Sequence, residues 1–197
     1  MSEAHDASIN FSTGRVYVSQ DGDDDLLVAR CLQGDKAAFE TLVERYQRVL
    51  FTVALRMLGD HDEAVDATQN AFVKSYEKLA TFDRKRRFFS WIYRILFNEC
   101  LNARRDRKPR EPLTPDLAAV GSASDLLEAH ERRRSVQQAI LTLPIEHREV
   151  VILRHFTELS YEEIGETLGI ETKTVKSRLH SARQRLAELL LAWDTRK

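Results

Sequence analysis

The chain has 197 residues, of which 43% are hydrophobic and 31% charged, and its formal net charge is -1. This composition fits one sizeable globular domain or two small ones and excludes fibrous and wholly disordered classes. Cys31 and Cys100 form no CxxC pair, so neither a disulfide framework nor a zinc site is indicated, and a reducing cytoplasm fits. The sequence lacks a run of about 18 apolar residues, so we expect no membrane-spanning helix. It also lacks a basic start followed by an apolar run, so we expect no signal peptide.

The N-terminal half predicts a tail followed by four helices. Residues 1–22 are rich in Ser, Asp and Gly, and we expect them to be mostly disordered. Helical spacing of apolar residues then begins, with Asp24 or Asp25 as the first cap, Asp35 as the second cap and Gly59 as a stop. The expected helices cover approximately residues 24–33, 36–58, 62–79 and 87–107, and no strand pattern competes with them.

A proline-rich segment separates the two halves of the chain. Residues 108–124 contain Pro109, Pro112, Pro115 and Gly121, which predicts an interdomain linker that would extend over roughly 55 Å. Helices follow at approximately residues 125–141, 144–156, 160–168 and 172–192, the first opened by an Asp125/Glu128 capping box. The sequence therefore predicts an all-α fold of two small helical domains, residues 23–107 and 125–197, joined by a flexible linker.

Residues 159–186 divide sharply by charge. Positions 160–171 carry four acids and no base, whereas positions 172–185 carry five bases and no acid. A capping box at Ser160 and Glu163, a turn at Gly169 and a small crossing residue at Gly165 predict a helix-turn-helix. Its second helix would lie in a major groove, where phosphates exclude acids. The alternative is a solvated amphipathic helix. The predicted duplex contacts are Thr172, Lys173, Thr174, Lys176, Ser177, Arg178, His180, Ser181 and Arg183.

Residues 84–108 form a second basic segment, with nine bases and two acids. Phe88, Phe89, Trp91, Tyr93 and Phe97 lie between the bases. Cations bind phosphates and rings stack on unpaired bases, so this composition suits single-stranded nucleic acid. A core helix with its aromatic residues inward and a basic rim explains the segment equally well, and the sequence leaves both alternatives open.

Three segments together resemble the extracytoplasmic-function sigma factors, the smallest group of the major bacterial sigma family. Residues 63–82 are similar to the helix that docks on the polymerase clamp, with Asp66, Gln69 and Phe72 matching its pattern. Residues 88–107 resemble the promoter-melting segment, with Trp91 and Asn98 in their usual places. Residues 160–186 resemble the region-four helix-turn-helix. The resemblance covers approximately residues 24–192.

The resemblance implies a transcription initiation factor whose partners are core RNA polymerase and promoter DNA. The helix-turn-helix residues above would bind the minus-35 element as duplex. The residues implied for the melted minus-10 strand are Arg84, Lys85, Arg86, Arg87, Phe88, Trp91, Arg94, Asn98, Asn102 and Arg105. Those implied for core polymerase are Glu63, Asp66, Gln69, Asn70 and Phe72.

The clamp-docking helix departs from the family pattern, because Val65 and Asn70 stand where carboxylates are usual. One hypothesis is that phosphorylation of Thr68 restores negative charge there. The sequence leaves open whether an anti-sigma factor, a regulatory kinase or the N-terminal tail controls the protein.

No motif for catalysis stands out, since Gly-rich phosphate loops, H-E-x-x-H and nucleophile motifs are all lacking. We therefore expect neither an enzyme nor a metal or other cofactor. Two rivals are a free-standing dimeric helix-turn-helix regulator, which leaves the N-terminal half unexplained, and an enzyme with an appended DNA-binding domain.

Overall fold

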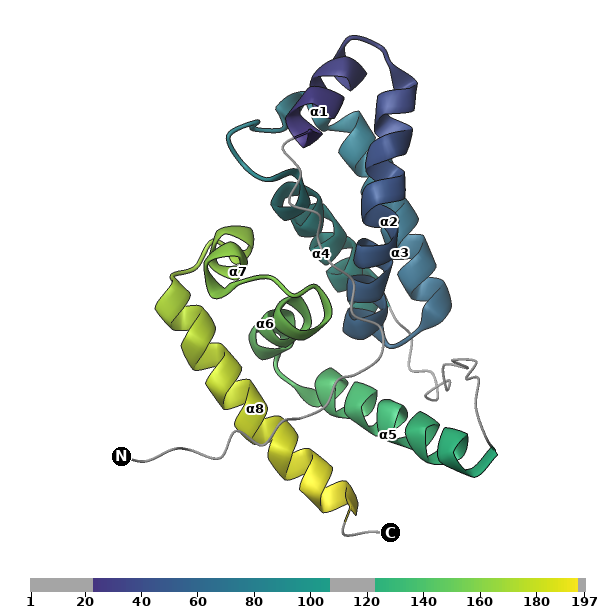
Figure 1. Cartoon of the computed structure of the whole chain (residues 1–197), viewed down its shortest axis with the longest axis vertical. Helices are drawn as coiled ribbons and strands as arrows, with labels where there is room; N and C mark the ends of the chain where they lie inside the picture. Colours follow the sequence, from purple (N-terminus) through teal and green to yellow (C-terminus); the bar gives the residue numbers. More distant parts are fainter. Residues whose placement is uncertain (1–22, 107–122, 195–197) are drawn as a thin grey trace.

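The computed structural model describes residues 23–106 and 123–194, and these ranges are helical without strands (Figure 1). The predicted all-α fold is confirmed. The expected tail and nearly all of the expected linker lie outside the described residues. The helices are α1 (Asp24–Leu32), α2 (Lys36–Leu58), α3 (His61–Glu77), the 3-10 turn η1 (Leu79–Thr81), α4 (Phe88–Asp106), α5 (Ala123–Thr142), α6 (Ile145–Phe156), α7 (Tyr161–Leu168) and α8 (Thr172–Asp194).

Local signals set most of the helix boundaries. The side chain of Asp35 accepts a hydrogen bond from the backbone N–H of Ala38 and so caps α2, which ends at Gly59 with a φ of 73°. The expectation that Asp24 or Asp25 caps α1 is wrong. The cap position is Asp23, without a side-chain bond, and Asp24 instead accepts a 2.6 Å bond from Arg45 Nη1 of α2. The Asp24 carboxylate therefore links α1 to α2 instead of capping the N-terminus of α1.

Helix α3 packs through small side chains. Ala64, Ala67 and Ala71 are buried, so α3 can approach α2 and α4 closely. Tyr76 is 46% exposed, and its ring makes an edge contact with Phe39. Val73 and Tyr76 of this helix therefore lie partly at the surface, because the alanines and Phe72 already fill the contact face.

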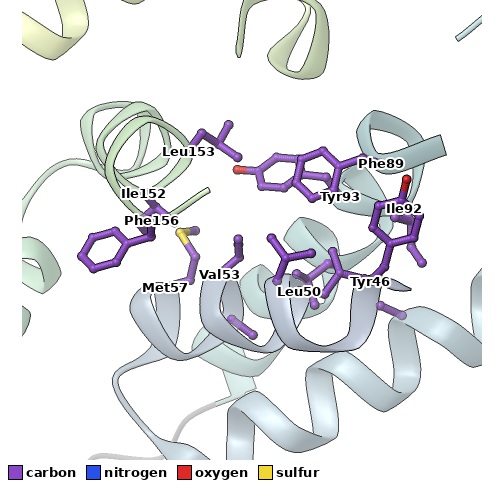
Figure 2. Packing of buried hydrophobic residues seen from close by; sticks show 14 of the residues in the cluster. Tyr46, Leu50, Val53, Met57, Phe89, Ile92, Tyr93, Ile152, Leu153 and Phe156 are labelled. Carbon is purple, nitrogen blue, oxygen red and sulfur yellow. The ribbon is translucent and has the colours of Figure 1, made fainter. Parts of the chain in front are cut away.

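The two halves of the chain share one hydrophobic core, which the sequence did not predict. Ile152, Leu153 and Phe156 of α6 pack against α2 and α4 (Figure 2). The α2 side of this contact includes Met57, and the α4 side includes Phe89. In Figure 1, α7 accordingly lies beside α4, and α6 contacts α2. Burial of these apolar side chains favours association of the halves, because each large aliphatic or aromatic residue contributes roughly 1.5–3 kcal/mol when removed from water.

A buried arginine forms hydrogen bonds to both halves of the chain at this junction. Arg148 of α6 is 2% exposed, and its guanidinium donates to the carbonyls of Ile140 at 3.1 Å, Leu143 at 3.1 Å and Met57 at 3.0 Å, and also to Leu141. These carbonyls lie at the C-terminal ends of α5 and α2 or just beyond, where the helix dipole favours a cation. Burial lowers the pKa of Arg148 to about 10, so the group keeps its charge at neutral pH.

A second polar contact crosses the same junction. Arg56 Nη1 of α2 donates to Gln137 Oε1 of α5 at 2.7 Å, and Gln137 Nε2 donates back to the carbonyl of Arg56 at 3.2 Å. The Arg56 guanidinium also lies 4.5 Å from the centre of the Phe156 ring. The junction thus combines an apolar centre with specific polar bonds at its edge.

Candidate nucleic-acid interface

Helices α7 and α8 form the helix-turn-helix that the sequence predicts. Ser160 Oγ accepts from the N–H of Glu163 at 3.2 Å, and Glu163 Oε2 accepts from the N–H of Ser160 at 2.7 Å, which completes the capping box. Gly169 ends α7 with a φ of 69°. A Cβ at Gly165 would lie 2.8 Å from the carbonyl oxygen of Ile170, so only glycine fits where the two helices meet.

Helix α8 has one buried and one open side. Its apolar residues Val175, Leu179, Ala182 and Leu186 are buried. Lys173, Lys176, Ser177 and His180 are exposed, and Thr172, Thr174, Arg178, Ser181 and Arg183 are half-buried. A basic face is therefore open to solvent, with Lys173 paired to Glu171 at 2.7 Å where α8 begins, and its role in duplex binding stays a prediction.

The aromatic residues of the basic segment separate into core and surface. Phe88, Phe89 and Tyr93 are buried in α4, whereas Trp91 is half-buried. Phe88, which we expected to contact DNA, packs 5.5 Å from the ring of Tyr46 in the core. The core alternative thus holds for most of these rings. The polar side chains that we expected to bind the strand are accessible to solvent. Arg87 is half-buried, and the exposed ones are Arg84, Lys85, Arg86, Arg94, Asn98, Asn102 and Arg105.

A cavity of about 570 Å³ lies where the loop before α4 meets α4 and α7. Four cations and two aromatic rings line it, which is the combination that binds a phosphate and a stacked base. The ring centres of Phe82 and Trp91 are 5.2 Å apart. The lining residues are Thr81, Phe82, Asp83, Lys85, Arg86, Arg87, Ser90, Trp91, Arg94 and Glu166.

Three contacts hold α7 against this cavity. Arg87 forms an ion pair with Glu163, and the hydroxyl groups of Ser90 and Thr167 are 2.9 Å apart and buried. Arg94 Nε donates to the carbonyl of Thr167 at 3.2 Å. These partners were not predicted from the sequence, although the run of acids in residues 160–171 is a signal that α7 suits a basic surface.

A buried carboxyl group lies between α4 and α6. Tyr93 OH donates to Glu149 Oε1 at 3.3 Å, and both side chains are buried. Burial raises the pKa of Glu149 to about 7, while the Tyr93 hydrogen bond and the positive charge of Arg178 act in the opposite direction. Burial also raises the pKa of Tyr93 well above its usual value. The junction of the two halves therefore contains one carboxyl group that titrates near neutral pH.

The residues expected to bind polymerase lie on α3. Asp66, Gln69 and Asn70 are exposed and Glu63 is half-buried, which leaves a polar face available for a partner. Phe72 is only 8% exposed and belongs to the core.

The structure places the residue of the phosphorylation hypothesis inside the fold. Thr68 is 7% exposed, and its hydroxyl donates to the carbonyl of Ala64 at 2.7 Å. A phosphoryl group needs solvent or cations around it. The folded α3 offers neither at this position, so the hypothesis gains no support.

Residues 23–106 and 123–194 show no structural sign of metal binding or of a membrane crossing. No group of three or more His, Cys, Asp and Glu side chains there is arranged to hold a metal ion. None of the helices in these ranges combines the length and apolar character that a membrane crossing requires.

Comparison with known proteins matches both halves of the chain to family models. Residues 42–110 match Sigma-70 region 2, and residues 133–186 match Sigma-70, region 4. These two ranges contain the cavity residues on α4 and the helix-turn-helix, respectively.

Curated relatives match along most of their length. The chain is 34% identical to the ECF RNA polymerase sigma factor SigW of Bacillus subtilis, over 80% of this chain and 91% of that protein. It is 34% identical to the RNA polymerase sigma-H factor of Pseudomonas aeruginosa (85% and 93%) and 32% identical to the ECF RNA polymerase sigma-E factor of Escherichia coli (82% and 91%).

Two solved structures share the arrangement of the helices. CnrH in complex with the cytosolic domain of CnrY matches with a TM-score of 0.67 and 27% identity, over 86% of this chain and 97% of that one. The sigma factor RpoE of Bartonella quintana, in complex with the anti-sigma factor NepR, matches with a TM-score of 0.62 and 27% identity, over 77% and 96%.

Proposed function

Because the chain belongs to the ECF family of RNA polymerase sigma factors, we propose that it binds core RNA polymerase and directs it to particular promoters. One observation carries this proposal. Both family regions match, in order, and each contains an open basic surface in the described structure. A factor that must address two promoter elements needs both surfaces in one chain.

The open face of α8 is the surface that we assign to the minus-35 element. Lys173 and Lys176 are positioned for phosphates, and Ser177 and His180 offer hydrogen-bonding groups to base edges. The buried stripe on the opposite side of α8 holds this helix on α6 and α7. The buried residues of α8 therefore stabilise the domain and also orient the exposed face of the helix toward solvent.

The cavity beside α4 is the surface that we assign to the melted minus-10 strand. Trp91 is half-exposed at its wall, and Arg86, Arg87 and Arg94 surround it. An unpaired base gains stacking energy on such a ring, about 1–3 kcal/mol, while the cations bind the flanking phosphates. Phe88 supports the site from the core instead of contacting DNA.

The polar face of α3 is the surface that we assign to core polymerase. Asp66, Gln69 and Asn70 are exposed together on one helix, away from the buried alanines. Polymerase and chromosomal DNA are cytoplasmic partners, so the protein acts in the cytoplasm. It acts by binding and needs no catalytic group or cofactor of its own.

Reconstituted transcription tests this function directly. Core polymerase with the purified chain should produce promoter-specific transcripts, and core polymerase alone should not. A free-standing dimeric regulator would shift duplex DNA by itself and yield no such transcripts. The regulator is the less favoured function, because it leaves the region-two match unused.

A further inference from the structure

The acidic helix α7 lies at the mouth of the basic cavity, on the residues that we assign to the minus-10 strand. We propose that α7 masks this site within the same chain, its carboxylates taking the place of DNA phosphates. This inference rests on the proposed function of the cavity and describes how that site is regulated. Release of α7 would then be a condition for binding the melted strand.

The ion pair at the mouth supports the substitution of a carboxylate for a phosphate. Arg87 binds Glu163, and a guanidinium recognises a carboxylate and a phosphate through the same charge-assisted bonds. The side chains of Arg87 and Glu163 are 30% and 18% exposed, so little water competes for them. An Arg87 held in this way is not available to DNA.

Two more residues of α7, Thr167 and Glu166, contact or contribute to the lining of the cavity. The carbonyl of Thr167 accepts the bond from Arg94 Nε, and the hydroxyl of Thr167 meets that of Ser90. Glu166 contributes to the lining itself. A strand that entered the cavity would meet a negative charge and two occupied arginines.

The charge of α7 fits this role better than a general solubility role. Tyr161–Leu168 contains three acids and no base, and two of the three, Glu163 and Glu166, lie at the cavity. The third acid, Glu162, is exposed and neither lines the cavity nor pairs with one of its arginines among the described residues.

The masking affects one DNA site and leaves the other open. In the same arrangement, Lys173, Lys176, Ser177 and His180 of α8 remain exposed. The chain therefore presents its duplex-reading face, while Arg87 and Arg94 of its strand-reading cavity are bonded to α7.

A single substitution tests the ion pair without removing the helix cap. Glu163→Gln keeps a side chain that can accept from the N–H of Ser160, because Gln also completes a capping box. Glu162→Gln is the matched control, with the same charge change on the same helix.

The full chain, without polymerase, is titrated with fluorescent single-stranded DNA of random sequence. Glu163→Gln should bind about fivefold tighter than wild type, the change expected when one partly exposed ion pair is lost, and Glu162→Gln should match wild type. Equal affinity of all three, or an equal gain in both variants, would overturn the proposal.

A reversible crosslink tests the closure itself. Ser90→Cys together with Thr167→Cys places two thiols where the hydroxyls are 2.9 Å apart, within reach of a disulfide. The oxidised protein should lose strand binding, and reductant should restore it in the same sample. Strand binding unchanged by oxidation, or failure of the disulfide to form, would contradict the proposal.

These outcomes are separable from failure of the function. If wild type with core polymerase yields no promoter-specific transcripts, the proposed function fails, whatever the strand-binding results. If transcripts appear but the crosslinked protein opens promoters as well as the reduced one, only the masking fails.

Discussion

At the scale of single residues, Glu149 is the side chain whose charge state matters most to the junction. It is buried between α4 and α6, and the charged or titratable groups that face it are Tyr93, Arg178 and Glu146. Its pKa is raised to about 7 from 4.5, so packing favours the neutral form. Protonation of Glu149 therefore favours the folded state. This contribution to the free energy of unfolding is fully present below about pH 4.5 and is lost as the pH rises through about 7. A shift of this size corresponds to roughly 3 kcal/mol.

Glu149→Gln should flatten this pH dependence, because an amide keeps a neutral partner for Tyr93 at every pH. Thermal unfolding of wild type should shift to lower temperature between pH 5 and pH 8, and the shift should be smaller by several degrees in the variant. Glu162→Gln, at an exposed acid on α7 that does not act on the pKa of Glu149, should behave like wild type. Parallel curves for wild type and Glu149→Gln would show that Glu149 does not titrate in the junction.

At the scale of the elements, the meeting of α7 with α8 depends on one missing side chain. Gly165 lies under the backbone of the turn, and both Val175 and Leu179 of α8 are buried nearby in the same domain. Backbone cannot move aside as the end of a flexible side chain can, so added volume here changes the angle between the helices.

Gly165→Ala should destabilise the protein by about 1–3 kcal/mol through overpacking, despite the better helix propensity of alanine. The free energy of unfolding from urea titration measures this cost. Glu166→Ala, at the next and exposed position, should cost less than about 0.5 kcal/mol. If both variants proved equally stable, the close approach at Gly165 would not be a constraint.

These examples also show which parts of the site the sequence could predict. The capping box, the Gly169 turn and the open basic face of α8 follow from neighbours within one or two turns of helix. The burial of Phe88 and the pairing of Glu163 with Arg87 do not, because their partners lie far away in the chain. The same ring can be core or surface according to what packs on it.

At the scale of the whole molecule, the surfaces that we propose for polymerase binding and for duplex binding lie in opposite halves of the chain. The polar face of α3 lies in the N-terminal half, and the basic face of α8 lies in the C-terminal half (Figure 1). The two functions should therefore be separable by substitution.

Lys176→Ala should weaken use of the minus-35 element by about threefold to tenfold, and lessen its salt dependence, because one phosphate contact is lost. Binding to core polymerase should stay unchanged. Footprinting and transcription at several salt concentrations measure the first effect, and gel filtration with core polymerase measures the second. An equal loss of both activities, with normal folding by circular dichroism, would contradict the assignment of α8.

Asp66→Lys should have the opposite profile. It reverses one exposed charge on α3, and we expect affinity for core polymerase to fall by tenfold or more while the isolated chain keeps its fold. Competition against a second sigma factor for limiting core polymerase measures the loss. Unchanged competition would place the polymerase surface elsewhere.

The sequence by itself determined the helices, the caps of α2 and α7, the helix-turn-helix and the segregation of basic surfaces, because helix period, capping and charge act between residues close along the chain. Only the tertiary structure decided that the two halves share a core, that Phe88 belongs to it, and that Glu163 closes on Arg87, 76 positions away. The reason is physical: burial and ion pairing depend on distance in space, and no local spacing specifies which distant surface will arrive.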